Sequence, residues 1–305
     1  MAREQQTASL LRFRRIIYHI RRMRTYPIPI VVAVCCTGFL VLFFILTVLL
    51  YFLLPLPLPQ HHRLAVIVPF RDRFDELLQF VPHMTAFLRA QRIRFDIFVI
   101  NQVDEYRFNR ASLINVGFLY TKDTHDYVVM HDVDLLPDNR DLRYDFPALD
   151  TVMHIASPEL HPRYHYKKFI GGILIISTSD FQRVKGMSNN YWGWGMEDDE
   201  FYVRLNESKI QINRPVGITS GYRTFLHIHD ARQRKRDVER LPGQRDAMRK
   251  RDREGGVHNV GFLIQNRYDL IINGSSCTIV NVKLHCDLIK TPWCVLPNVT
   301  ASSKA

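Results

Sequence analysis

The sequence lacks several features that would place the protein in a common class. Only 5 of its 305 residues are cysteine and only 14 are glycine, which excludes a small disulfide scaffold and a collagen-like chain. It contains no phosphate-binding glycine loop, no dinucleotide-binding glycine fingerprint and no internal repeat. With 47% hydrophobic residues, the chain has enough apolar material for one large domain or two small ones.

Acidic residues are almost absent from the first 29 positions, which hold seven arginines and one acid, Glu4. This segment therefore supplies +6 of the formal net charge of +11, and the remaining 276 residues supply only +5. A basic chain raises the possibility of nucleic-acid binding. The excess charge, however, is gathered at one end of the chain, next to a long apolar segment.

No charged residue occurs in the 25 residues from Ile30 to Leu54. As a helix they would span about 37 Å, enough to cross the roughly 30 Å hydrocarbon core of a membrane. A signal peptide has a shorter apolar region, and a helix lying on the membrane surface needs a polar face. The sequence therefore predicts a type II membrane protein with a cytosolic tail (1–29), a transmembrane anchor (30–54), a stem (55–63) and a lumenal domain (64–305). A lumenal domain meets no nucleic acid, so that partner is not expected.

Three cysteines, Cys277, Cys286 and Cys294, lie in the last thirty residues, and an oxidising lumen would allow two of them to pair. Sequence alone does not determine the pairing. The pair Cys286–Cys294 is favoured because it closes a short local loop. Glycosylation motifs begin at Asn206, Asn273 and Asn298, and they would be used only on the lumenal side.

Short apolar runs alternate with helical patterns in the lumenal domain. Strands are predicted at 64–68, 95–100, 127–130 and 171–176, and helices at 75–92, with a bend or break near Pro82, and at 110–120 and 197–207. Strands and helices in this alternation form parallel crossover units. We therefore expect an α/β domain whose ligands bind at the carboxyl ends of the strands.

Carboxylates and imidazoles occur at two places with the spacing of a metal site. Asp132 and Asp134 follow the strand at 127–130, where hard oxygen ligands suit Mg²⁺ or Mn²⁺, although aspartate after a strand is more often a turn residue. His227 and His229 alternate on an extended segment, so both rings point to one face. With no cysteine nearby, this set favours Mn²⁺ over a structural zinc ion.

The segment from Tyr191 to Glu200 is the most specific motif in the chain. Trp192 and Trp194 alternate with glycines and offer flat apolar faces on which sugars stack. Four acids follow at the start of a predicted helix, where the helix dipole would favour one or two, so that one of the four is a candidate general base. Residues 230–254, with ten basic and six acidic side chains, are either a solvated loop or a mobile lid.

These motifs resemble those of the β-1,4-galactosyltransferases (glycosyltransferase family 7), which are type II Golgi membrane enzymes. The resemblance covers residues 64–290 in the family's order and is carried by the segments 69–73, 108–110, 132–134, 169–172 and 192–199. It is greatest to the members that act on xylosylated proteoglycan core proteins, through Arg73, the Tyr164–Tyr166 stretch, Met196 and the His227–His229 pair. Phe169 departs from the family pattern, in which a tyrosine is expected.

The resemblance implies a GT-A-type nucleotide-sugar-binding fold, with a mixed, mostly parallel sheet flanked by helices and preceded by one transmembrane helix. It implies Mn²⁺-dependent, inverting transfer of galactose from UDP-galactose to O4 of xylose on a proteoglycan core protein. Transfer to N-acetylglucosamine is the alternative within the family, and a carbohydrate-binding protein without turnover is the alternative outside it. Residues 230–254 would be the lid that orders after the donor binds.

The resemblance also implies roles for individual residues. Asp198 would be the catalytic base, and Glu197 and Asp199 would orient substrate hydroxyls. The metal ligands would be Asp134, His227 and His229, and the acceptor site would comprise Met196, Glu197, Asp198 and Asp199. UDP-galactose would contact Pro69, Phe70, Arg71, Asp72, Arg73, Phe108, Asn109, Arg110, Val133, Asp134, Tyr164, Trp194, His227, Ile228, His229 and Arg236.

Overall fold

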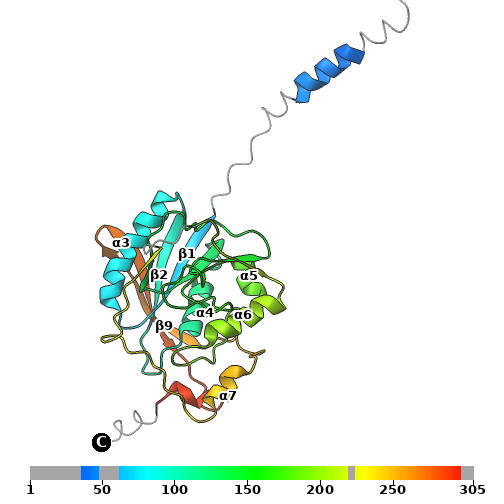
Figure 1. Cartoon of the computed structure of the whole chain (residues 1–305). Coiled ribbons are helices and arrows are strands. Elements are labelled where there is room, and N and C mark those ends of the chain that lie inside the picture. Colours follow the sequence, from blue (N-terminus) through cyan, green and yellow to red (C-terminus); the bar gives the residue numbers. More distant parts are fainter. Residues whose placement is uncertain (1–35, 48–61, 219–223, 297–305) are drawn as a thin grey trace, which may run out of the picture. The chain divides into compact units, whose positions relative to one another are not determined.

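The computed structural model describes residues 36–47, 62–218 and 224–296 (Figure 1). They fall into two units, one that ends at Gln60 and one that begins at His61. In the first unit, residues 36–47 form an exposed helix. No helix within the described ranges combines the length and the apolar character needed to cross a membrane. The predicted tail, most of the predicted anchor and stem, and Asn298 lie outside the described residues.

The second unit is built on an eight-stranded mixed sheet with the order β7-β5-β6-β3-β1-β2-β10-β9. Its strands are β1 (Arg63–Phe70), β2 (Arg94–Gln102), β3 (Tyr127–His131), β5 (Thr151–His154), β6 (Ile173–Ser177), β7 (Gln211–Asn213), β9 (Phe262–Ile272) and β10 (Ser275–Leu284). Four of the seven neighbouring pairs are parallel, and three are antiparallel. The predicted α/β domain with a mixed sheet, and the four predicted strands, are thus confirmed. In addition, β4 (Leu135–Pro137) pairs with β8 (Phe225–His227) in a separate two-stranded sheet.

Helices cover both faces of the sheet. They are α3 (Phe74–Ala90), α4 (Arg110–Thr121), α5 (Thr178–Arg183), α6 (Glu197–Glu207) and α7 (Gln244–Arg249), with a short 3₁₀ turn at Pro292–Cys294. Helix α3 runs unbroken across Pro82, so the predicted break does not occur. Its neighbours Phe80, Val81 and Met84 are fully buried, and this packing holds the helix together across the lost hydrogen bond.

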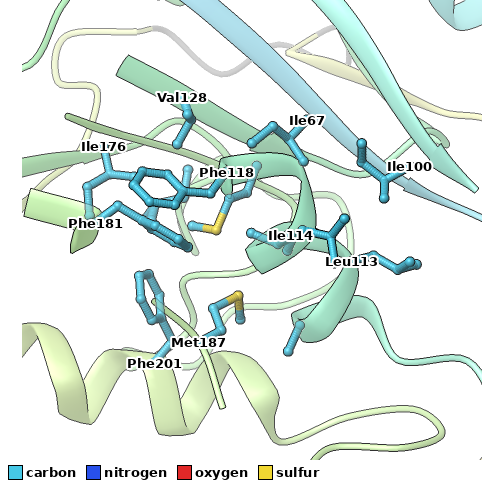
Figure 2. Packing of buried hydrophobic residues seen from close by; sticks show 14 of the residues in the cluster. Ile67, Ile100, Leu113, Ile114, Phe118, Val128, Ile176, Phe181, Met187 and Phe201 are labelled. Atoms are coloured by element: carbon cyan, nitrogen blue, oxygen red, sulfur yellow. The ribbon is translucent and has the colours of Figure 1, made fainter. Parts of the chain in front are cut away.

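Strand β1 is buried on both faces, as its continuous apolar run predicts. Leu64, Val66 and Val68 pack in the cluster on the α3 face. Ala65 and Ile67 point the other way, because side chains alternate along a strand. Figure 2 shows this second cluster, where Ile67, Ile100, Val128 and Ile176 of the sheet meet residues of α4.

The C-terminal strands β9 and β10 were not predicted from the sequence. They form an antiparallel hairpin whose turn is Asn273-Gly274, with φ of 49° and 76°. Two positive φ values in sequence, on Asn-Gly, are typical of the tight turn that joins twisted strands. Beyond the hairpin, Cys286 and Cys294 form a disulfide, and Cys277 is a buried free thiol.

Strands β1, β2 and β3 are mutually parallel, and therefore end at one edge of the sheet. Each is followed by one of the polar segments singled out in the sequence. Asn109 ends the segment after β2 and caps α4, because its side chain accepts the backbone N–H of Ser112. The fold thus gathers these segments on the side where ligands of open α/β sheets bind.

Candidate functional site

A cavity of about 600 Å³ opens at this edge of the sheet. Its walls come from the segments after β1, β2 and β3, from residues between 161 and 172, from the loop before α6 and the start of that helix, and from residues between 227 and 240. The predicted site residues that line it are Pro69, Arg71, Asp72, Arg73, Phe108, Arg110, Val133, Asp134, Tyr164, Trp194, Met196, Glu197, Asp198, Asp199, His227, His229 and Arg236. The fold therefore brings most of the predicted residues into one place.

Three predicted donor contacts do not line the cavity. Phe70 is buried in the core on the α3 face. Asn109 is fully buried, and its side chain is used to cap α4. Ile228 packs against the core, and its backbone N–H donates to the carbonyl oxygen of Asp134 over 2.9 Å. The side chains of these three residues support the site instead of forming its surface.

Arg71 lines the cavity, but its guanidinium group serves the loop between β2 and α4. It donates to the carbonyl oxygens of Gln102, Asp104 and Tyr106 over 3.2, 3.0 and 2.6 Å. It also pairs with the Asp104 carboxylate at 3.3 Å. These bonds brace the loop, and the contact of Arg71 with UDP-galactose stays a prediction.

The predicted metal ligands Asp134, His227 and His229 lie together. His229 Nδ1 is 3.1 Å from Asp134 Oδ2, and the two histidine rings stack at 5.6 Å with an angle of 15°. Burial lowers the pKa of both histidines, which favours the neutral rings that bind metals. One carboxylate and two neutral imidazoles are a donor set that suits Mn²⁺.

The guanidinium group of Arg73 lies beside Asp134 and His229, where a bound cation would balance the charge of the carboxylate. Arg73 Nη1 lies 3.3 Å from His229 Nδ1 and 3.6 Å from Asp134 Oδ2. With the side chains placed this way, no three histidine, cysteine or acidic residues in the described ranges are arranged to hold a metal ion. A positive charge held between Asp134 and His229 nevertheless shows that the position accepts a cation.

Carboxylates that line the cavity converge on one arginine, Arg110. Arg110 donates through Nε to Asp132 Oδ1 at 2.8 Å and through Nη1 to Asp198 Oδ1 at 2.9 Å. Burial raises the pKa of Asp198 and, with Asp198 nearby, raises the pKa of Glu197 to about 7. The nearby Arg110 guanidinium opposes this rise at Asp198.

The loop before α6 presents a single tryptophan to the cavity. Gly193, Gly195 and Met196 all have positive φ, so the backbone follows a path that glycine adopts readily. Trp194 is 43% exposed at the cavity, whereas Trp192 is buried in the core and packs edge-on against Tyr106. The prediction that both tryptophans offer faces to sugars is therefore wrong for Trp192.

Residues 233–237 and Arg240 of the charged segment 230–254 line the cavity, so the segment is not simply a solvated loop. Arg236 places its guanidinium over the rings of Trp194 and Tyr164, at 4.8 and 5.7 Å. Arg234 pairs with the buried carboxylate of Glu76 on α3 over 2.8 Å. The segment is thus attached to the two sides of the cavity, as a lid would be.

Arg107 binds the segment 230–254 through several hydrogen bonds. Its buried guanidinium donates to both carboxylate oxygens of Asp237 at 2.6 and 2.7 Å, to Gln244 Oε1 at 3.1 Å, and to the carbonyl oxygens of Glu239 and Trp293. Its backbone N–H donates to the carbonyl oxygen of Cys294. One arginine therefore joins the lid segment, α7 and the C-terminal turn.

Sequence reasoning missed three residues of this arrangement. Arg107 and Glu76 bind partners far along the chain, and no local pattern distinguishes them. His161 lines the cavity beside His227. Its only signal in the sequence is its position three residues before Tyr164, a predicted donor contact.

Comparison with known proteins gives the family. Residues 54–146 match the N-terminal region of glycosyl transferase group 7, and residues 151–228 match the N-terminal domain of galactosyltransferase. Beta-1,4-galactosyltransferase 7 of Mus musculus is 54% identical over 250 residues, which are 79% of this chain and 76% of the relative. Xylosylprotein 4-beta-galactosyltransferase of Caenorhabditis elegans is 51% identical over 246 residues, 79% of this chain and 85% of the relative.

Solved structures are similar over the same part of the chain. The catalytic domain of Drosophila beta1,4galactosyltransferase 7 in complex with xylobiose has a TM-score of 0.76 and 52% identity, covering 77% of this chain and 99% of that one. A mutant of that enzyme in complex with manganese, UDP-Gal and xylobiose has a TM-score of 0.75 and 52% identity, covering 76% and 98%. The predicted resemblance is confirmed: the chain belongs to the β-1,4-galactosyltransferases of glycosyltransferase family 7.

Proposed function

We propose that the protein is a Mn²⁺-dependent, inverting galactosyltransferase of GT-A type, which transfers galactose from UDP-galactose to O4 of xylose on a proteoglycan core protein. The observation that carries this proposal is the cavity itself. It combines a cation position, a partly buried carboxylate paired with an arginine, and an exposed tryptophan. Relatives that act on xylosylated protein or bind xylobiose, manganese and UDP-Gal support the choice of substrates.

The donor side of the site lies around Asp134. Asp134, His227 and His229 would hold Mn²⁺, which neutralises the charge that develops on the departing UDP. Arg73, already directed at this position, would move to the diphosphate when the metal binds. Trp194 and Arg236 would cover the galactose from the lid side.

The acceptor side lies around Asp198. This carboxylate would take the proton of the xylose O4 hydroxyl while that oxygen bonds to the anomeric carbon of galactose and the bond from that carbon to the UDP oxygen breaks. Attack opposite the leaving group inverts the anomeric configuration. Burial raises the pKa of Asp198, which favours its acceptance of a proton, and Arg110 pairs with its carboxylate at 2.9 Å. Glu197 and Asp199 would orient substrate hydroxyls, with Met196 beside them.

We also propose that the protein is a single-pass type II Golgi membrane protein. The uncharged segment 30–54 and the basic residues before it support this topology. In this arrangement 55–63 would be the stem and 64–305 the lumenal catalytic domain. Digestion of intact vesicles from cells that make the protein tests it. The C-terminal domain should resist protease until detergent is added, and cleavage without detergent would refute the topology.

Transfer of radiolabelled galactose tests the activity. Detergent-solubilised full-length protein should transfer label from UDP-galactose to a β-xyloside in the presence of Mn²⁺ and lose this activity in EDTA. Preference for an N-acetylglucosaminide would instead establish the alternative acceptor, and transfer to neither would refute the function.

Two variants test the roles of individual residues. Asp198→Asn should abolish transfer but keep UDP binding, whereas the exposed Asp123→Asn should behave like the wild type. His227→Ala should raise the Mn²⁺ concentration needed for half-maximal activity. An unchanged Mn²⁺ titration would remove His227 from the metal site, and full activity of Asp198→Asn would remove Asp198 as the base.

A further inference from the structure

His161 lines the cavity and has no role in the mechanism given above. Its ring is buried, with 5% of the residue exposed. It packs against the rings of Tyr164 and Phe169, with centroids 5.0 Å away in both cases, and lies 6.3 Å from the ring of His227. Aromatic neighbours on several sides hold the ring in one orientation next to the cation position.

The hydrogen bonds of His161 determine which ring nitrogen carries the proton. Nδ1 accepts the backbone N–H groups of Arg163 and Tyr164, both at 2.9 Å. A ring nitrogen that accepts a hydrogen bond carries no proton, so the proton of this ring is on Nε2. Nε2 can therefore act only as a hydrogen-bond donor and not as an acceptor.

This donor has no acceptor in the part of the chain that the structure describes. Other buried histidines differ in this respect. His131 uses both ring nitrogens, contacting the carbonyl oxygen of Asp132 and the hydroxyl of Tyr144. His154 contacts the carbonyl oxygen of Gly171 through Nε2. Because His161 lines the cavity, its Nε2–H is available to donate to a ligand bound there.

The position of the ring indicates the chemistry of that acceptor. Nδ1 faces the backbone of its own loop, which leaves the Nε2 edge for the cavity wall that also carries His227. In the proposed function, the part of the ligand that lies next to the cation position and His227 is the diphosphate of the sugar nucleotide. Ionised phosphate oxygens accept hydrogen bonds without donating them, which matches a group that can only donate.

We propose that His161 is a further donor-binding residue, whose Nε2–H donates to a phosphate oxygen of the nucleoside diphosphate. This inference rests on the proposed function. In this role His161 orients the diphosphate beside the metal ligands without adding charge. It complements Arg73, which supplies charge at the same end of the cavity.

Two substitutions separate the two nitrogens of the ring. His161→Asn places an amide oxygen close to the position of Nδ1, so the loop N–H groups keep their acceptor but the donor toward the cavity is lost. His161→Gln places an amide nitrogen close to the position of Nε2 and keeps the donor. His258→Asn, at an exposed histidine, is the matched control.

Calorimetric titration of full-length protein with UDP and with UDP-galactose, in the presence of Mn²⁺, provides the readout. We expect His161→Asn to weaken both ligands about tenfold or more, with a melting temperature close to that of the wild type. His161→Gln should bind both within about threefold of the wild type, and His258→Asn should be unchanged. If His161→Asn does not fold, His161→Gln is tested alone against the same threefold limit.

Several outcomes would overturn the inference. Wild-type affinity of His161→Asn for both ligands would show that no bond is made. Loss of affinity for UDP-galactose alone would assign the bond to a sugar hydroxyl. A loss in His161→Gln as large as that in His161→Asn would show that the donor is not what matters. Failure of the wild-type protein to bind UDP-galactose at all would instead count against the proposed function.

Discussion

The substitution Gly171→Ala should impair the proposed base without touching it chemically. A methyl group added to Gly171 would lie 2.4 Å from Asp198 Oδ2 and 2.8 Å from Cε2 of Phe169. Ordinary contacts begin near 3.4 Å, so the Asp198 carboxylate must retreat by about 1 Å. Gly171 does not have positive φ, and alanine can therefore adopt its backbone conformation. The effect of the substitution is directed at the carboxylate.

The size of the effect follows from this displacement. A misplacement of about 1 Å in a reacting group costs about 100-fold in rate, or about 2.7 kcal/mol of activation free energy. We therefore expect kcat for transfer to a β-xyloside to fall about 100-fold, because Asp198 makes the closest contact with the added methyl group. Overpacking should also lower the free energy of unfolding by about 1–3 kcal/mol.

Gly117→Ala is the matched control, because it produces the same overpacking away from the cavity. Its methyl group would lie 2.5 Å from Cγ2 of Ile67, in the core beneath α4. This variant should lose a similar amount of stability but keep kcat within about threefold per folded molecule. Initial rates, together with thermal melting to measure the folded fraction, distinguish the two variants. A normal kcat in Gly171→Ala, or an equal loss in Gly117→Ala, would refute the reasoning.

Three further predictions concern pH, the disulfide and the lid. Burial raises the pKa of Glu197 from 4.5 to about 7, so its ionisation lowers the stability of the fold as the pH rises through that interval. The melting temperature of Glu197→Gln minus that of the wild type should therefore be larger at pH 8 than at pH 4. An equal difference at both pH values would contradict this assignment. Cys286→Ser removes a disulfide between residues eight positions apart, and should lower the free energy of unfolding in urea by about 2.5 kcal/mol. Cys277→Ala, at the free thiol, should lower it by less, and equal losses would contradict the prediction. Gly193→Ala would put a methyl group against the guanidinium of Arg107 and, with φ of 83°, should make residues 230–254 more sensitive to trypsin, whereas unchanged digestion would argue against Arg107 as the support of the lid.

The parts of the site that the sequence predicts depend on local patterns. A continuous apolar run indicates a strand buried on both faces, so the end of β3 and Asp134 could be placed on the ligand-binding edge. Alternation placed His227 and His229 on one face, and the structure shows their rings stacked. These inferences require only the periodicity of a strand and the tendency of parallel strands to end together.

The parts that the sequence does not predict depend on contacts between distant segments. Trp192 and Trp194 have similar local surroundings, but Tyr106 packs against one and leaves the other in the cavity. Arg71 follows β1 directly, but its hydrogen bonds to carbonyl oxygens of the β2–α4 loop depend on a segment more than thirty residues away. The Asn273-Gly274 pair read as a glycosylation motif, and its role as a hairpin turn depends on the pairing of β9 with β10.

The bonds of Arg107 determine where a working catalytic unit has to end. The residues that line the cavity end at Arg240, but Arg107 also donates to the carbonyl oxygens of Trp293 and Cys294. An enzyme shortened to stop after β10 would keep every group proposed for chemistry and lose two of the acceptors that fix this arginine. Arg107, which binds residues 237–244 of the lid, would then lack its hydrogen bonds to the C-terminal turn. Expression of the catalytic domain for binding or kinetic work should therefore include the C-terminal turn and its disulfide.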